Sequence, residues 1–509
     1  MTMAAAGQRA HAGPTATGGP GWALPVAVAL AVAGLQLWLV ARAGTDVPFY
    51  DQWGVEGRWL YPAWLDGSLR FFDLLRPHNE HHIFWTNLLN LGLFSVDGQW
   101  DPLVQLAAIV ALRAACAAGL AAGLMAGWGR TGRLLVAAGT VWAFLPHLAW
   151  HSILWGIESH TYFCLGFSLL ALGILAGARL SPGKWFFGLA AGAAAQFGME
   201  VGACVPLALL ALAAMKLIER RPGRVVWQLL GAAALLLALA AALHVTVPGH
   251  AALEAAAPRQ FLAVLGRCLA WPYPNDAWVG LAANLPLGLL TGLRLARRRV
   301  PRPGEDFVLL IGSFALAASV AEAALRGGSP ELAVGLPSRY VDYQILLPVA
   351  NAWCLCALLP AAPARWKRVA SIGALAWGIV LTLGWLALSA EMWRGVLRPR
   401  IADRDAPVRL MQAFQASGDP GVFAGQPRLY VPNPSLAQVQ QVLTDPRLRG
   451  HLPPSLQPGR PEGPLSRWVR RARRPANLLP GLALAAAAAF AAAGTRRRGL
   501  TPGVASGGT

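Results

Sequence analysis

The chain has 509 residues, of which 56% are hydrophobic and 13% are charged. A soluble protein carries roughly a quarter charged residues, so this composition excludes an ordinary soluble globular protein. The formal net charge of +19 would suit a nucleic-acid-binding protein. In a membrane protein, however, cytoplasmic loops collect Arg and Lys, so no nucleic-acid partner is expected.

Apolar runs long enough to cross a ~30 Å hydrocarbon layer as helices recur along the chain. They predict an all-α polytopic membrane protein with about 12 transmembrane helices. The predicted spans are residues 22–41, 103–126, 133–149, 160–178, 185–199, 201–217, 225–245, 277–293, 307–325, 341–360, 369–390 and 477–494. The pair 185–199 and 201–217 is short, so it predicts either a tight hairpin or broken helices.

The predicted domains follow from these spans. Residues 1–21 form a disordered cytoplasmic tail, and residues 22–396 form a membrane domain that includes a large first outer loop, 42–102. A small outer α/β appendage covers residues 397–476 and precedes the last span, 477–494, and a cytoplasmic tail, 495–509. In the appendage, Ser435 and Gln438 have the spacing of a helix N-cap, and "RLYVP" at 428–432 predicts a short strand.

The charges predict the orientation of the chain. The short segments "GWGRTGR", "ARLSPGK", "KLIERRPGR", "RLARRRVPRP", "ARWKR" and "TRRR" are basic and fall on one side, which is therefore expected to be cytoplasmic. With twelve spans, this arrangement predicts that both termini lie in the cytoplasm. One basic segment, "RWVRRARRP" from Arg467, disagrees because it falls on the outer side.

Nine of the ten histidines fall in outer loops or at the outer ends of spans. Any chemistry is therefore expected on the outer face. The first outer loop opens with "TDVPFYDQW", which places Asp46 and Asp51 near the membrane surface. Aromatic residues flank Asp51, and a carboxylate that loses hydration among them would suit a general base.

The same loop continues with "RPHNEHHIFW", which gathers His78, Glu80, His81 and His82. Pro77 suits the first position of a helix, so we expect an interfacial helix with Glu80 in its first turn. His78 and His82 would then share one helix face. Three interpretations stay open: a metal site that uses His78, His82 and a carboxylate, a proton-handling or substrate-binding cluster, or a polar helix start at the water interface.

Two further polar segments lie at the outer ends of spans. "LPHLAWHSILWGIESHTYF" includes His151, Glu158 and His160, which would orient a substrate unless the segment only anchors its tryptophans at the interface. "LPSRYVDYQ" places Arg339 beside Tyr340. Arg339 would bind a lipid phosphate, or it would snorkel or pair with Asp342.

A carboxylate at the start of a large outer loop, followed by a second one on an interfacial helix, resembles the GT-C superfamily. These are polytopic glycosyltransferases that use sugars carried on polyprenyl phosphate. "FYDQW" and "HNEHH" also resemble a bacterial branch of membrane proteins with a similar first loop, which implies a bacterial inner (plasma) membrane protein. The resemblance implies that Asp51 is the general base, with Asp46 as a spare, that Glu80 is the second acidic residue, and that Arg339 holds the carrier phosphate.

The resulting hypothesis is an inverting transfer of a hexose or pentose from a polyprenyl-phosphate carrier to a glycan, lipid or protein acceptor at the outer face. Asp51 and Glu80 would be catalytic. The substrate-binding residues would be Asp46, His78, His81, His82, Glu158, His160, Arg339 and Tyr340. A divalent cation, Mg or Mn, would be held by Asp51, Glu80, His78 and His82 if one is used. The alternatives are a transporter or flippase, and a polymerase or ligase of lipid-linked polysaccharide.

Overall fold

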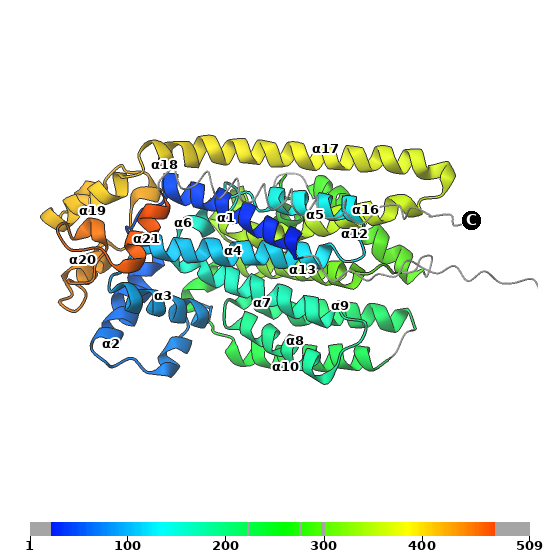
Figure 1. Ribbon diagram of the computed structural model, residues 1–509, viewed down its shortest axis with the longest axis horizontal. Helices are drawn as coiled ribbons and strands as arrows, with labels where there is room; N and C mark the ends of the chain where they lie inside the picture. Colours follow the sequence, from blue (N-terminus) through cyan, green and yellow to red (C-terminus); the bar gives the residue numbers. More distant parts are fainter. Residues whose placement is uncertain (1–21, 221–222, 274–276, 297–300, 474–509) are drawn as a thin grey trace, which may run out of the picture.

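The protein is helical throughout the part of the chain that its computed structural model describes, which comprises residues 22–220, 223–273, 277–296 and 301–473. No β-strand occurs in these residues. Long helices run side by side along the longest axis of the molecule, and shorter helices gather at one end of the bundle (Figure 1). The prediction of an all-helical membrane domain is confirmed at this level.

Nine helical segments of the described residues are long and apolar enough to cross a membrane. Each overlaps one of the predicted spans, as expected for a multi-pass membrane protein. In chain order they are Ala23–Ala43 (α1), Pro102–Leu124 (α4), Gly156–Leu175 (mostly α7, Ser159–Leu175), Glu200–Ile218 (mostly α9, Cys204–Ile218), Arg224–Leu243 (α10), Trp278–Leu295 (in α12, Ala277–Leu295), Glu305–Arg326 (α13), Ser338–Ala361 (around α16, Leu346–Leu358) and Ala364–Ala402 (around α17, Lys367–Met392).

Two predicted spans correspond to shorter helices. α5 (Arg130–Ala143) has 14 residues and α8 (Pro182–Gln196) has 15. At ~1.5 Å per residue such helices are only about 22 Å long, which is less than the hydrocarbon thickness. The predicted span 133–149 is therefore too long, whereas 185–199 has the same length as α8 but starts three residues too late. α8 packs mainly against α7. The predicted span 477–494 and the tails 1–21 and 495–509 lie outside the described residues.

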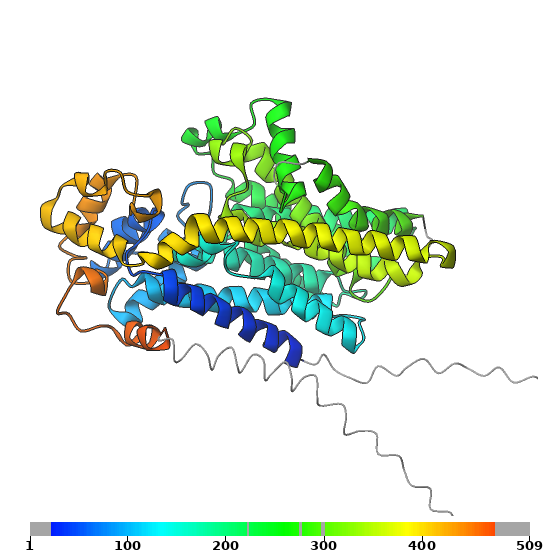
Figure 2. The ribbon, with the colours of Figure 1, turned by 90° about the horizontal axis from the view of Figure 1, so that it is seen from above.

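The loops that carry the basic segments gather at one end of the bundle. They join α4 to α5, α7 to α8, α9 to α10, and α16 to α17 (Figure 1). The opposite end carries α2 (Tyr61–Leu65), α3 (Phe84–Asp97), α19 (Ala406–Ser417), α20 (Leu436–Thr444) and α21 (Pro464–Ala472), which Figure 2 shows from a second side. We refer to this second end as the outer end.

The first loop and the appendage share one hydrophobic core at the outer end. Its members come from both segments and include Trp53, Tyr61, Trp100, Met411, Phe414, Val439 and Val442. The contact is close at Gly57, where a Cβ atom would lie 2.8 Å from a methyl group of Val442. The appendage is therefore held in place by the first loop.

The appendage is all-helical in the described residues, so the predicted strand at 428–432 is wrong. Residues Arg428–Tyr430 form a 3-10 turn in which Tyr430 N donates to Pro427 O at 2.8 Å. Proline on both sides of the segment removes the backbone donors that a strand ladder needs. The predicted N-cap is confirmed, because the Ser435 side chain accepts a hydrogen bond from Gln438 N at the start of α20.

Replacing Asp97 with alanine is expected to loosen α21 at a cost of about 1 to 2 kcal/mol. The Asp97 carboxylate accepts hydrogen bonds from Leu465 N at 2.7 Å and Ser466 N at 3.0 Å, so it caps this helix from the end of α3. Amide hydrogen exchange in residues 464–472 should speed up in Asp97→Ala, whereas exchange in α20 should stay at the wild-type rate. Unchanged exchange in α21 would show that its other contacts are sufficient.

Candidate functional site at the outer end

The histidine-rich segment of the first loop forms a tight turn. His78 N donates to His81 O at 2.8 Å and His81 N donates to His78 O at 3.0 Å. Asn79, inside the turn, has a φ of +52°, a conformation that Asn tolerates better than most residues. The predicted helix from Pro77 is therefore wrong, because α3 begins only at Phe84. His78 and His82 do not share a helix face, and Glu80 occupies the tip of the turn.

Glu80 is held by groups from three parts of the chain. Its carboxylate forms an ion pair with Arg326 at the end of α13, and its Oε2 atom lies 2.8 Å from Nδ1 of His250. His81 Nε2 lies 3.8 Å from Oε1 of the same carboxylate. Glu80 therefore joins the first loop to α13 and to the 3-10 turn Pro248–Leu253.

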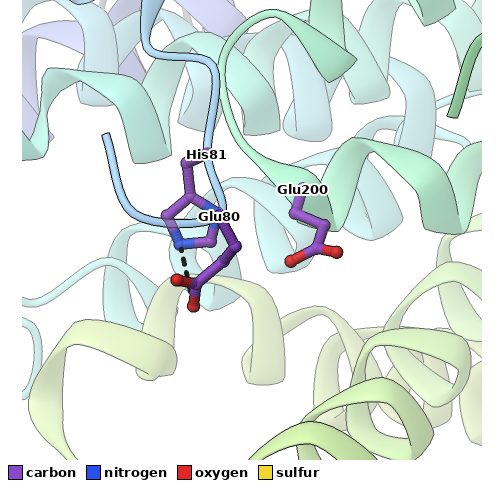
Figure 3. Close-up of side chains that lie close together, drawn as sticks. All are labelled: Glu80, His81 and Glu200. Carbon is purple, nitrogen blue, oxygen red and sulfur yellow. Dashed lines mark ion pairs between the residues drawn. The ribbon is translucent and has the colours of Figure 1, made fainter. Parts of the chain in front are cut away.

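Glu200 completes this cluster from the corner between α8 and α9. Donor atoms of Glu80, His81 and Glu200 all lie within 4.8 Å of one another, and Figure 3 shows the three side chains close together. The corner is tight, because a Cβ atom at Gly202 would lie 2.6 Å from the backbone of Ala195. His244, at the end of α10, stands behind Glu200 with Nδ1 3.6 Å from its carboxylate.

His81 is electrostatically the most perturbed residue of the turn. Burial is the main cause that lowers the pKa of its imidazole to about 3, and neighbouring histidines, His160 first among them, act in the same direction. The His81 and His160 rings lie 6.2 Å apart. His81 is therefore a neutral imidazole at physiological pH, which is the form that binds metal ions.

His82 serves a structural purpose in this geometry. Its Nδ1 atom lies 2.8 Å from Leu75 O, and its Nε2 atom lies 3.0 Å from Leu243 O. Both ring nitrogens thus face carbonyl oxygens, which join the loop to the end of α10. His82 is not positioned as a metal ligand, and the predicted ligand set of Asp51, Glu80, His78 and His82 is not assembled among the described residues.

Asp51 lies at the rim of the site and pairs with His78. Their closest atoms, Oδ2 and Nε2, are 3.4 Å apart, and the Asp51 side chain is 39% exposed. The expected loss of hydration at Asp51 is therefore not seen, although Phe49, Tyr50 and Trp155 do pack against one another beside it. The pair offers a carboxylate and an imidazole to a substrate that arrives from solvent.

Arg339 lies on the same side of the molecule and pairs with Glu331. Arg339 Nη2 is 2.5 Å from the Glu331 carboxylate, and the guanidinium stacks on Tyr340 with 4.9 Å to the ring centroid. Arg428 of the appendage approaches the other oxygen of Glu331 at 3.5 Å. Partial burial opposes ionisation of Glu331, but the two guanidinium groups outweigh it and lower its pKa.

The predicted alternative of an Arg339–Asp342 pair is wrong, because Asp342 pairs with Arg113.

The helix α6 (Trp150–Leu154) contacts both the segment next to Asp51 and the segment next to Arg339. His151 N donates to Ser338 Oγ at 3.2 Å, and the His151 ring lies 6.4 Å from that of Phe49. Arg428 also bridges the two sides, because its Nε atom donates to Tyr50 Oη at 2.6 Å. Next along the chain, Glu158 lies 3.9 Å from His160 and accepts a hydrogen bond from Thr161.

Asp46 stands apart from this site. It is buried, and it accepts hydrogen bonds from Ser455 N and from Arg470 of α21, each at 3.0 Å. Arg470 also bonds Asp101 at 3.0 Å. The expectation that Asp46 is a spare general base is not supported by this position, and part of the outer basic segment "RWVRRARRP" has a structural role in fixing α21.

The chain matches no protein-family model, no curated protein and no solved structure.

The structure adds residues that sequence reasoning did not single out. Glu200, Arg326 and Arg428 are distant in sequence from the first loop and meet it only after folding, and Glu331 joins Arg428 to Arg339. For His244 and His250 the sequence did give an indication of a place near the site, because both belong to the histidines expected on the outer side. The outer end thus holds two polar centres: a rim around Asp51, His78 and Arg339, and a deeper cluster around Glu80, His81 and Glu200.

Proposed function

We propose that this protein is an inverting glycosyltransferase that moves a sugar from a polyprenyl-phosphate carrier to an acceptor at the outer end of the bundle. The observation that carries the proposal is a link between the Asp51–His78 pair and Arg339 at the outer end. Arg428 forms this link, because it donates to Tyr50, next to Asp51 in the chain, and approaches Glu331, the partner of Arg339. The reaction needs both a proton acceptor and a cationic site for phosphate. The basic end of the bundle would face the cytoplasm, as in other membrane proteins.

In this reaction the Asp51 carboxylate takes the proton of the acceptor hydroxyl. The acceptor oxygen forms a bond to the anomeric carbon, and the bond from that carbon to the phosphate oxygen breaks with inversion. The electron pair leaves on the carrier phosphate. His78, next to Asp51, orients the carboxylate. The partly exposed pair of Asp51 and His78 is open to an acceptor from solvent.

Arg339 would hold the carrier phosphate where the negative charge develops. Its guanidinium already binds one oxyanion, the Glu331 carboxylate, and phosphate oxygens present the same fork-shaped acceptor geometry. Exchange of Glu331 for phosphate would leave Glu331 paired with Arg428. Tyr340 would hold the Arg339 guanidinium in a fixed orientation, because the guanidinium stacks on the Tyr340 ring.

Replacing Asp51 with asparagine is expected to slow sugar transfer about 10² to 10⁴-fold, because the substitution removes the proton acceptor and keeps its shape. The purified protein in nanodiscs is incubated with radiolabelled polyprenyl-phosphate sugars and a membrane extract, and label leaving the lipid fraction is counted. Asp66→Asn is the matched control, because Asp66 is an exposed carboxylate of the same loop that pairs with Arg447.

The control variant should transfer at the wild-type rate. Full transfer by a correctly folded Asp51→Asn protein would remove Asp51 from the mechanism. The absence of label release by folded wild-type protein, with every donor in the panel, would reject the glycosyltransferase proposal in favour of transport.

A further inference from the structure

We infer that Glu80, His81 and Glu200 form a binding site for a transition-metal dication of the zinc class. The three residues come from two separate parts of the chain, the turn of the first loop and the corner between α8 and α9 (Figure 3). The inference concerns metal binding itself, so it holds whether or not the protein transfers sugars.

The spacing of the donor atoms suits a single ion. One donor atom from each residue lies within 4.8 Å of the other two. Donors bound to one zinc ion lie about 3 to 4 Å from one another, because each is about 2 Å from the metal. Small rotations of the two glutamate side chains would therefore allow all three residues to coordinate the same zinc ion.

The charges around the three residues also favour a cation. The carboxylates of Glu80 and Glu200 lie close together here, and such like-charged neighbours repel when both are ionised. Arg326 contacts Glu80 and is permanently charged. His250 beside Glu80 and His244 beside Glu200 are imidazoles, which carry a positive charge only when protonated. A dication between Glu80 and Glu200 would attract both carboxylates. Each carboxylate oxygen has two lone pairs, so Glu80 can keep Arg326 as a partner while it binds an ion.

His81 provides a second and independent indication of a ligand. Its Nδ1 atom is buried and has no hydrogen-bond partner in the part of the chain that the structure describes. Buried polar atoms without a partner are uncommon, and a bound ion or water is a usual reason for one. The ring belongs to a turn whose backbone is fixed by two hydrogen bonds between His78 and His81.

The groups next to the three proposed ligands are of the kind that orient ligands in known metal sites. Ligating side chains are commonly oriented by a further hydrogen-bonding group. His250 Nδ1 lies 2.8 Å from Glu80, and His244 Nδ1 lies 3.6 Å from Glu200, so each carboxylate has an imidazole beside it. One imidazole and two carboxylates favour zinc over magnesium, because magnesium prefers oxygen ligands and retains several waters.

Metal content tests the inference directly. The full chain is purified without a polyhistidine tag, stripped with EDTA, reconstituted in nanodiscs and dialysed against micromolar ZnCl₂ or MgCl₂. Bound metal is measured by mass spectrometry, and zinc affinity by competition with a chromophoric chelator. The test variants are Glu200→Gln and His81→Gln. The matched controls are Glu331→Gln and His151→Gln, a carboxylate and an imidazole at the same end that lie outside the cluster.

We expect one zinc per chain in the wild type and both controls, and an affinity at least 10-fold weaker in each test variant. Added zinc should also raise the Tm of wild-type protein but not that of the folded Glu200→Gln protein. Wild-type protein that retains no zinc, or test variants that retain as much as wild type, would overturn the inference. Zinc binding without sugar transfer would reject only the proposed function, and transfer without zinc binding would reject only the metal site.

Discussion

Replacing Arg113 with methionine is expected to lower the free energy of unfolding by about 3 to 5 kcal/mol, because it leaves a buried aspartate without its cation. Arg113 of α4 is fully buried, and its Nε and Nη2 atoms lie 2.9 Å and 2.8 Å from Asp342 Oδ1. Tyr162 Oη donates to the other oxygen of Asp342 at 2.8 Å, and Arg113 Nη1 donates to Phe144 O at 2.7 Å. An uncompensated charge inside a membrane bundle is expensive.

The double variant Arg113→Met/Asp342→Leu distinguishes this charge effect from a simple loss of packing. It removes both charges and should recover a large part of the stability that the single variant loses. Unfolding is followed in nanodiscs by heat or by added denaturing detergent. A single variant that loses less than about 1 kcal/mol, in the range of an exposed ion pair, would contradict the expected role of the pair.

The transmembrane helices were predictable because the hydrophobic signal is local. An apolar run such as residues 103–126 specifies a helix by its composition and length, and α4 follows at Pro102–Leu124. The errors occur where local signals compete. Pro77 and the apolar residues after it suited a helix start, but the backbone bonds between His78 and His81 close a turn first.

The site was predictable only for residues that are neighbours in sequence. "HNEHH" identified the turn, but Glu200 and Arg326 reach Glu80 through the packing of helices that are more than 100 residues away in the chain. The buried partner of Asp342 was missed for the same reason. Arg113 lies inside an apolar run, and nothing local indicates that its partner is 229 residues further on.

Replacing Glu56 with alanine is expected to cost about 3 to 4 kcal/mol at pH 5, because several buried donors lose their acceptor at once. Glu56 lies in a π-helical segment, Trp53–Leu60, and its side chain is fully buried. Its carboxylate accepts hydrogen bonds from Trp100 Nε1 at 2.6 Å, Gln105 Nε2 at 2.8 Å and Asn90 Nδ2 at 2.9 Å. These bonds join the π-helical segment to α3 and α4. Asp66→Ala, at an exposed carboxylate, should cost at most about 1 kcal/mol.

The cost of Glu56→Ala should also depend on pH. Burial raises the pKa of Glu56 to about 7, although the bonds from Gln105, Gln52 and Trp100 act in the opposite direction. Because the pKa in the folded state is above the unfolded value, the protonated carboxyl contributes most to stability below pH ~4.5, and this contribution is lost as the pH rises through 7. The alanine variant lacks this titration, so its cost relative to wild type should be smaller at pH 8 than at pH 5, by about 2 kcal/mol. Thermal unfolding of both proteins at the two pH values measures the difference, and an equal cost at both would show that Glu56 keeps one protonation state over this range.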